Sequence, residues 1–209
     1  MKKIIIVDDH PVVRRGLKQI IEEEPDMEVA GEAKNAGEFF SLLRTVNCTL
    51  VLLDISLPDK NGLDVLKQLQ HEHPQLPVLI LSIHPEDQYA VRFIKAGASG
   101  YLMKEGAPEE LVKAIRKVNA GGKYVSASLA EKLVSHLDGF DKPPHENLSD
   151  REFQILRMIA EGKSLKGIAD ELCISEKTVS TYRSRILEKM KMSTTADIIS
   201  YALKNKLID

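Results

Sequence analysis

Two kinds of hydrophobic pattern alternate over the first 120 residues of the chain. Short unbroken apolar runs, such as Leu-Val-Leu-Leu at residues 50–53, predict strands that are buried on both faces, as in a parallel sheet. Between these runs, apolar residues recur every three or four positions, which predicts helices with one buried face. The predicted strands are residues 3–7, 27–32, 50–54, 77–82 and 99–103, and the predicted helices are residues 11–24, 36–45, 62 onward, 86–96 and 108–120. Strand and helix alternate five times, so we expect an α/β fold with a five-stranded, doubly wound parallel sheet.

The pattern changes after residue 122. Residues 123–146 form a predicted linker, which is helical over 128–137 and otherwise rich in turn-forming residues. Beyond the linker the chain predicts helices only, and the first begins at a capping box formed by Ser149 and Glu152. The helices that follow are residues 165–172, 176–191 and 194–203. Two helices joined by the three-residue turn 173–175, inside a small all-α domain, suggest a helix-turn-helix. The predicted domains are therefore residues 1–122 and 147–209, joined by the linker.

Composition and charge limit the possible functions. Of the 209 residues, 43% are hydrophobic and 29% are charged, which is typical of a soluble globular protein with one large or two small domains. No apolar stretch reaches the ~18 residues that a membrane span needs, and the first strand starts at the N-terminus, so we expect a cytoplasmic protein without a membrane partner. Cys48 and Cys173 lack motif spacing and are expected to be reduced packing residues. Residues 147–209 carry 11 Lys or Arg against 9 Asp or Glu, whereas the rest carries 18 against 22, which suggests different partners for the two parts.

Four of the five predicted strands end in polar residues. These are Asp8 and Asp9, Asp54, Ser82 and Lys104. Because parallel strands place their carboxyl ends at one edge of the sheet, these groups can converge on one pocket. Carboxylates suit Mg²⁺, a lysine and a hydroxyl suit a phosphate oxygen, and a carboxylate beside Mg²⁺ can act as a nucleophile toward a phosphoryl group. The alternative is a set of unrelated strand ends with solvated polar residues.

The order and spacing of these residues resemble the signature of response-regulator receiver domains. The resemblance lies in Ile-Val-Asp-Asp-His at residues 6–10, Leu-Asp-Ile-Ser-Leu-Pro at 53–58, Ser82, and Gly-Tyr-Leu-Met-Lys at 100–104. The C-terminal part resembles the LuxR-type helix-turn-helix. Apart from the linker, nearly the whole chain therefore resembles a response regulator of the NarL/FixJ group.

The resemblance implies a flavodoxin-like receiver and a phosphorylated Asp54, with a sensor histidine kinase as the phosphoryl donor. It also implies Mg²⁺ as a cofactor, held by the side chains of Asp9 and Asp54, by the Ser56 carbonyl, and by Asp8 through water. Ser82 and Lys104 would hold the phosphoryl group.

Tyr101 lies three residues before Lys104 and has two interpretations. It is either an aromatic residue with a solvated hydroxyl group or, as the resemblance implies, a switch residue that turns inward when Ser82 moves toward the phosphoryl group. His84 is expected to be a solvated loop histidine.

The predicted helix over residues 176–191 has the features of a DNA-recognition helix. Its apolar stripe leaves a face of small polar residues, and the helix carries five basic against two acidic residues. An ordinary solvated helix would show the same pattern, but the position after a short helix and a turn favours double-stranded DNA as the partner. By resemblance, the expected base-facing residues are Lys177, Ser180, Thr181 and Ser184, and the basic residues expected at the phosphates are Arg183, Arg185 and Lys189.

The function we expect is a phosphorylation-activated transcriptional regulator of a two-component system. Beyond Mg²⁺-dependent self-phosphorylation from small donors and self-dephosphorylation, no enzymatic activity is expected. Phosphorylation is expected to expose the recognition helix and to favour a homodimer through Ile198, Tyr201 and Ala202 of the last helix.

Two other classes of function use the same features. A dehalogenase-like phosphatase would also use an aspartate nucleophile, but it needs a second carboxylate where this chain has Ser56, and its nucleophile lies on an early strand. A DNA-binding protein could instead use its receiver as a protein-binding module that needs no phosphorylation. The intact set of pocket residues argues against this last class.

Overall fold

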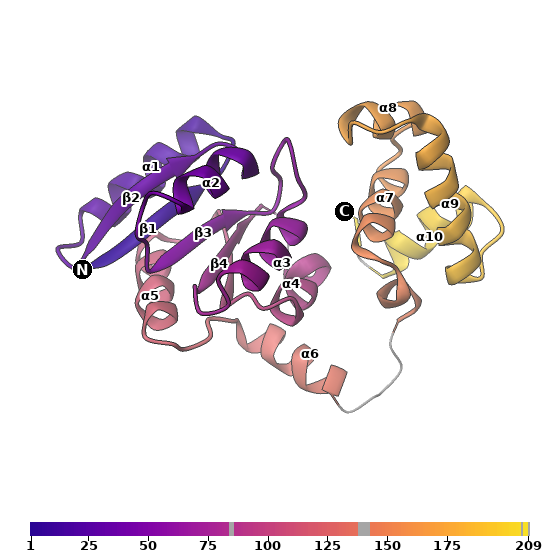
Figure 1. Cartoon of the computed structure of the whole chain (residues 1–209). Helices are drawn as coiled ribbons and strands as arrows, with labels where there is room; N and C mark the ends of the chain where they lie inside the picture. Colours follow the sequence, from indigo (N-terminus) through magenta and orange to yellow (C-terminus); the bar gives the residue numbers. More distant parts are fainter. Residues whose placement is uncertain (84–85, 138–142, 206, 209) are drawn as a thin grey trace. The chain divides into compact units, whose positions relative to one another are not determined.

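The computed structural model of the chain describes residues 1–83, 86–137, 143–205 and 207–208. The chain divides into two compact units, Met1–Leu133 and Val134–Asp209, and the boundary between them along the chain falls within α6 (Ala127–Leu137) (Figure 1). Residues 138–142 of the predicted linker and His84 lie outside the described residues.

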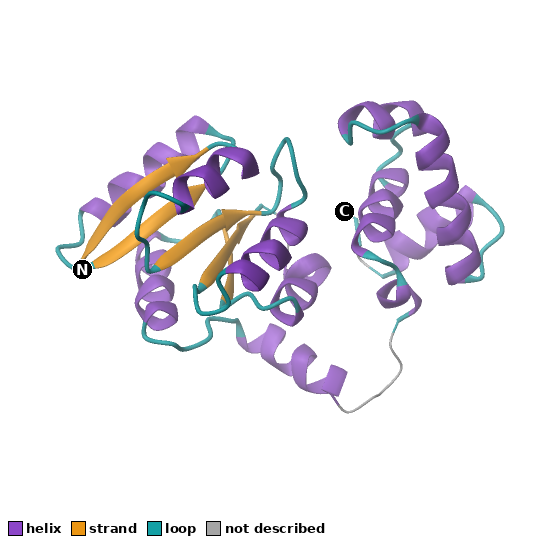
Figure 2. Ribbon diagram, viewed as in Figure 1, coloured by secondary structure: helices purple, strands orange, loops and turns teal. Residues whose placement is uncertain are grey.

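The first unit is built on a five-stranded parallel sheet (Figure 2). The strands are β1 (Lys2–Val7), β2 (Met27–Ala33), β3 (Leu50–Asp54), β4 (Val78–Ser82) and β5 (Gly100–Met103). Their order is β2-β1-β3-β4-β5, the flavodoxin-like arrangement of a doubly wound sheet. All residues of β3 and β4 are buried, because helices cover both faces. The predicted fold class is confirmed.

Helices cover the two faces of the sheet with two separate sets of core residues. The helices are α1 (Pro11–Glu22), α2 (Ala36–Leu43), α3 (Gly62–Glu72), α4 (Glu86–Lys95) and α5 (Pro108–Asn119). Phe39 of α2, Leu66 of α3 and Phe93 of α4 share one core with Val51 and Ile80 of the sheet. The other core contains residues of α1 and α5 packed against the opposite face of the sheet. Because all five strands run parallel, their carboxyl ends lie at one edge of the sheet.

Residues just beyond α5 extend the first unit past the predicted boundary at residue 122. The backbone N–H of Tyr124 donates to Ser99 (2.9 Å), and the backbone N–H of Tyr101 donates to the Tyr124 carbonyl (3.1 Å), so the chain passes alongside β5. Gly100 permits this approach, since a Cβ atom there would lie 2.7 Å from the Tyr124 carbonyl oxygen. Leu129 of α6 is then buried in the core over the α2–α4 face.

The second unit consists of helices over its described elements: η1 (Pro144–Asn147), α7 (Asp150–Ala160), α8 (Leu165–Glu171), α9 (Glu176–Met190) and α10 (Thr195–Lys204). Each α-helix has a Ser or Thr N-cap, and the predicted capping box of Ser149 and Glu152 is present. Between α8 and α9, Cys173 adopts a left-handed conformation (φ 52°) that turns the chain sharply. The predicted helix-turn-helix is therefore present in α8 and α9.

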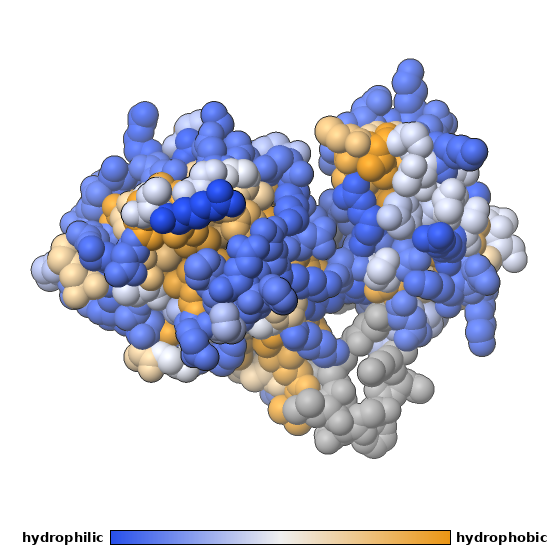
Figure 3. Space-filling model, viewed as in Figure 1, coloured by the Kyte–Doolittle hydropathy of each residue, from blue (hydrophilic) through white to orange (hydrophobic). Residues whose placement is uncertain are grey.

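Hydrophilic side chains dominate the face of each unit that Figure 3 displays. Among the described residues, no helix combines the length and apolarity required to cross a bilayer. Cys48 is half-buried and Cys173 is exposed, and both thiols are free.

Candidate functional sites

The polar strand ends come together at one edge of the sheet. Asp8 follows β1 and Asp54 ends β3, and these strands are neighbours with Val7 opposite Leu53. Asp8 and Asp54 are 1% and 3% exposed. Burying two carboxylates side by side is costly unless a cation compensates them. A local cation is therefore to be expected at this edge.

Lys104 supplies that charge from the residue after β5. Its Nζ lies 2.7 Å from Asp8 Oδ2 and 2.9 Å from Asp54 Oδ2, and its side chain is only 9% exposed. Burial raises the pKa of the Asp54 carboxyl group, an effect that Lys104 opposes and the charge of Asp8 reinforces. Burial alone would lower the pKa of Lys104, but the two carboxylates outweigh it and raise that pKa. The lysine therefore stays charged between the two aspartates.

Asp9 and His10 complete the acidic cluster. His10 Nδ1 lies 2.6 Å from Asp9 Oδ1, and the His10 backbone N–H donates to Asp8 Oδ1 (2.8 Å). One ligand atom from each of Asp8, Asp9, His10 and Asp54 lies within 4.8 Å of the others. One oxygen of each of these three aspartates is shielded from solvent and lies beside a basic side chain: Asp8 Oδ2 and Asp54 Oδ2 beside Lys104, and Asp9 Oδ1 beside His10. Such oxygens fit a hard divalent cation, so the residues present suit the Mg²⁺ that the resemblance implies.

The loop between β3 and α3 carries Ser56, the other expected metal ligand. The Ser56 backbone hydrogen-bonds to the Asp54 carboxyl group, and Ser56 forms a β-bridge with Asn61. The Gly62 backbone N–H then donates to the Ile55 carbonyl (3.0 Å). A Cβ atom on Gly62 would lie 2.7 to 2.8 Å from the backbone oxygens of Asp54 and Ile55, so this closure requires glycine. The sequence pattern identified residue 62 only as the start of a predicted helix.

Ser82 and Tyr101 lie on the two strands beyond Asp54. Ser82 is 1% exposed at the end of β4, next to the strand that ends in Asp54, and its carbonyl accepts from the backbone N–H of Lys104 (2.8 Å). Tyr101 is 0% exposed and lies in the core with Leu129 of α6. This excludes the interpretation of Tyr101 as an aromatic residue with a solvated hydroxyl group. Its role as a switch stays a prediction.

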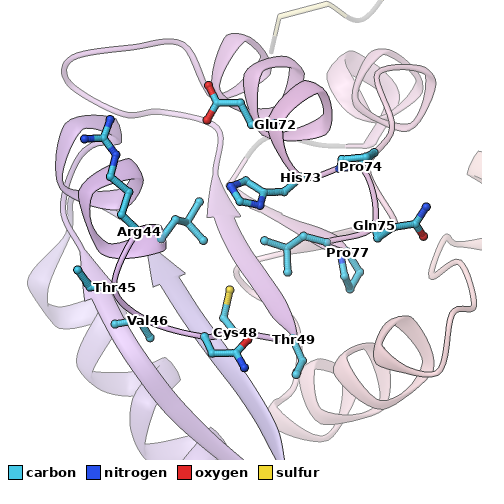
Figure 4. A pocket seen from close by; sticks show the side chains of 13 residues that line it. Arg44, Thr45, Val46, Cys48, Thr49, Glu72, His73, Pro74, Gln75 and Pro77 are labelled. Carbon is cyan, nitrogen blue, oxygen red and sulfur yellow. The ribbon is translucent and has the colours of Figure 1, made fainter.

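A cleft of about 760 Å³ lies at the opposite edge of the sheet, between the loops that precede β3 and β4 (Figure 4). Cys48 and His73 line it together with Arg44 and Glu72. Burial raises the pKa of the Cys48 thiol to about 11, so this thiol is a poor nucleophile and a poor metal ligand at neutral pH. Cys48 therefore gives this cleft no reactive thiolate.

The exposed face of α9 is the candidate DNA interface of the second unit. Val179, Ile186 and Met190 are buried, which confirms the predicted packing stripe. Lys177, Ser180, Thr181, Ser184 and Arg185 are exposed. The Thr181 hydroxyl donates to the Lys177 carbonyl (3.0 Å), and the Ser184 hydroxyl donates to the Ser180 carbonyl (3.2 Å). Both hydroxyl oxygens can still accept a hydrogen bond from a base.

Two of the basic residues predicted to bind DNA form contacts inside the second unit. Lys189 Nζ donates to Glu152 Oε2 (2.7 Å), and Glu152 is 3% exposed. Arg183 Nε donates to Thr195 Oγ1 (2.9 Å) at the start of α10. These contacts tie the recognition helix to α7 and α10. Contacts of Lys189 and Arg183 with DNA stay predictions.

The residues predicted for dimerisation lie largely inside the second unit. Ile198 and Ala202 are both 0% exposed, and the Tyr201 hydroxyl lies 2.8 Å from His145 Nδ1. Ile198 and Ala202 cannot reach a second copy without leaving the core, so their assignment to an interface is corrected. The exposed side of α10 carries Ala196, Ser200 and Leu203, with Ile199 partly exposed.

Two family models match the parts of the chain that carry these two sites. Residues 4–116 match the model of the response regulator receiver domain, and residues 146–202 match that of bacterial regulatory proteins of the luxR family. An acidic receiver pocket joined to a helix-turn-helix defines a two-component response regulator.

Comparison with individual proteins narrows the chain to one group of response regulators. The chain is 35% identical to the response regulator GacA of Pseudomonas aeruginosa, over 100% of this chain and 99% of that protein. It is 34% identical to the oxygen regulatory protein NreC of Staphylococcus haemolyticus, over 99% of each. RcsB of Salmonella enterica serovar Typhimurium, solved bound to promoter DNA with the phosphomimetic BeF₃⁻, is 25% identical with a TM-score of 0.70 over 96% of this chain and 97% of that one. The chain belongs to the NarL/FixJ group of response regulators.

Proposed function

We propose that Asp54 accepts a phosphoryl group from a sensor histidine kinase and that this modification activates DNA binding. The proposal rests on one observation: Asp54 is a buried carboxylate that shares the Lys104 ammonium group with a second buried aspartate. Such a group is shielded from bulk water yet lies beside a cation that can donate hydrogen bonds to phosphoryl oxygens. We expect the chain to encounter both partners, double-stranded DNA and the kinase, in the bacterial cytosol.

The transfer follows from the positions of the side chains. An Asp54 oxygen attacks phosphorus, the new P–O bond forms, and the P–N bond to the histidine of the kinase breaks. Lys104 and Ser82 lie at neighbouring strand ends and would hold the phosphoryl oxygens. Asp8, Asp9, Asp54 and the Ser56 carbonyl would hold Mg²⁺, which supplies neutralisation of the phosphoryl charge.

Catalytic turnover of other substrates is not part of the proposal. A phosphatase of the aspartate-nucleophile class needs a general acid two residues after the nucleophile, and Ser56 has no acidic proton to give near neutral pH. Self-phosphorylation from small donors and slow self-dephosphorylation are the chemistry that we assign to the chain.

Recognition of double-stranded DNA is assigned to α9. Lys177 and the short hydroxyl residues Ser180, Thr181 and Ser184 form its exposed polar face. Arg185 provides an exposed positive charge beside this face. Short side chains allow the helix to approach the floor of the major groove, and Arg185 suits a phosphate contact.

Phosphorylation is proposed to favour a symmetric dimer through α10. Ala196, Ile199, Ser200 and Leu203 recur at helical spacing on the exposed side, and the Leu203 residue is 53% exposed. A twofold pair of recognition helices calls for a roughly palindromic site.

Acetyl phosphate tests the phosphoryl-acceptor role. With Mg²⁺, mass spectrometry should find one phosphoryl group, located on Asp54. Chelation of Mg²⁺ by EDTA should suppress the modification, and Asp54→Asn should abolish it. Asp64→Asn is a matched control, because Asp64 is an exposed aspartate in the first turn of α3. Persistent phosphorylation of Asp54→Asn would show that the acceptor is another residue.

A further inference from the structure

Asp59 makes a contact that the sequence did not reveal. It lies near the tip of the β3–α3 loop, and its carboxylate accepts two backbone hydrogen bonds from the start of α2. Ala36 N donates to Oδ1 and Gly37 N donates to Oδ2, both at 2.9 Å. These are the first two residues of α2, whose N-terminal amides have no partner within the helix. A carboxylate is favoured there by both hydrogen bonding and the helix dipole.

The neighbouring residue strengthens the same attachment. Lys60 Nζ lies 5.7 Å from the ring centroid of Phe40 of α2, which permits a cation–π interaction. Leu57, also in the loop, packs against the core on the α2–α4 face. The loop is therefore closed at its base by Gly62 and attached to α2 at its tip.

This attachment bears on the acidic pocket because the same loop carries Ser56. Ser56 lies only two residues after Asp54, and its carbonyl can serve a cation only if the loop keeps its path. The base of the loop is fixed to Ile55 by the Gly62 N–H. Without the attachment at Asp59, the described contacts that hold the tip would be the cation–π contact of Lys60 and the packing of Leu57, both weaker than two hydrogen bonds to a carboxylate, and the Ser56 carbonyl would sample more orientations.

We propose that Asp59 is a positioning residue that holds the β3–α3 loop against α2 and thereby orients the Ser56 carbonyl for a divalent cation. The inference rests on the proposed function, since it assigns Asp59 to the cation site of the phosphoryl acceptor. Outer partners that orient a metal ligand typically change metal affinity by 10-fold or more when removed.

Asp59→Asn is the sharpest substitution. One amide oxygen can accept from Ala36 or Gly37, but the amide nitrogen then faces the other N–H donor. The residue keeps its size while the loop loses one hydrogen bond and its charge. We expect the dissociation constant for Mg²⁺ alone, measured by calorimetry or NMR titration of the full chain without any phosphodonor, to rise on the order of 10-fold.

Two control variants separate positioning from general effects. Asn35→Ala removes the side-chain cap that accepts from Glu38 N on the same helix and leaves Asp59 in place. Asp64→Asn removes one exposed negative charge next to the loop. Both should bind Mg²⁺ as the unsubstituted chain does. Circular dichroism of each variant establishes that it is folded.

Phosphorylation by acetyl phosphate, followed over a range of Mg²⁺ concentrations, completes the test. Asp59→Asn should need more Mg²⁺ but reach the same maximal rate, because Asp54 and Lys104 are unchanged. Unaltered Mg²⁺ affinity in Asp59→Asn, or an equal loss in Asn35→Ala or Asp64→Asn, overturns the positioning role and leaves the phosphoryl-acceptor function standing. If Asp59→Asn does not fold, Asp59→Glu, which keeps the charge but misplaces it, is expected to give the same shift. An unsubstituted chain that neither binds Mg²⁺ nor is phosphorylated refutes the proposed function itself.

Discussion

Replacing Lys189 with methionine should destabilise the second unit without removing a DNA phosphate contact. Lys189 Nζ donates to Glu152 Oε2 at 2.7 Å, and the same oxygen accepts from the backbone N–H and the hydroxyl of Ser149 at 2.7 and 2.8 Å. The Glu152 side chain is 4% exposed and that of Lys189 is 42% exposed. Methionine keeps most of the length and apolar volume of the lysine stem but removes its charge.

The expected magnitude lies between two limits. Removing one partner of a fully buried ion pair costs about 3–5 kcal/mol, and an exposed pair contributes about 0–1 kcal/mol. Because water reaches Lys189 but not Glu152, we expect Lys189→Met to lower the free energy of unfolding by about 1–2 kcal/mol. Urea denaturation at pH 7, followed by circular dichroism, measures this loss.

The pH dependence provides an independent check. Burial alone would raise the pKa of Glu152, but its bonds with Lys189 and Ser149 outweigh burial and lower it. A lowered pKa in the folded state stabilises the protein above the pKa of the unfolded chain, about 4.3, and this stabilisation is lost as the pH falls through the folded pKa. The stability difference between Lys189→Met and the unsubstituted chain should therefore be complete at pH 7 and shrink below about pH 4.

DNA binding distinguishes this structural role from the phosphate contact that the sequence predicted. Each lost phosphate contact reduces the slope of log affinity against log salt by about 0.9. Arg185→Met is the matched control, because Arg185 is exposed beside the same helix face, and it should reduce the slope by about that amount. Lys189→Met should leave the slope unchanged. An equal drop in slope with unchanged stability would refute the reasoning and restore Lys189 as a phosphate contact.

Three further substitutions test other parts of the structure. Gly62→Ala places a Cβ atom against the backbone of Asp54 and Ile55, so it should destabilise the first unit by about 1–3 kcal/mol and slow phosphorylation of Asp54, as urea denaturation and mass spectrometry would reveal. Leu203→Glu should prevent the dimer in sedimentation while changing stability by no more than about 0.5 kcal/mol, and a persisting dimer would rule out the exposed face of α10. Gly16→Ala in α1, where a Cβ atom meets nothing within 4 Å, should raise the free energy of unfolding by about 0.5–1 kcal/mol, and a loss would reveal a contact that the structure lacks.

The sequence predicted the fold because its strongest signals are local and periodic. The uninterrupted apolar run that leads into Asp54 permits little besides a strand buried on both faces, and the structure buries every residue of β3. The convergence of Asp8, Asp54 and Lys104 followed from the geometry of parallel strands alone. Resemblance then supplied the chemistry that the geometry permits.

Pairings between distant elements could not be predicted in the same way. Nothing in the sequence places Asp59 beside α2, where its partner Gly37 lies 22 positions earlier. Lys189 looked like any basic residue of a recognition helix, because its partner lies 37 positions away. The burial of Ile198 and Ala202 could not be predicted either, because an apolar helix residue can be covered by the unit's own core or by a second copy.

The most direct test of the account is the DNA affinity of the full chain, measured with and without beryllofluoride and Mg²⁺. The DNA is a site that the protein treated with beryllofluoride and Mg²⁺ has selected from random double-stranded sequences. Sedimentation of the same samples reports the oligomeric state. The account predicts tighter binding and a dimer only with beryllofluoride, and no response in Asp54→Asn. Equal affinity and equal mass with and without beryllofluoride would contradict it and favour a receiver that binds its partners without phosphorylation.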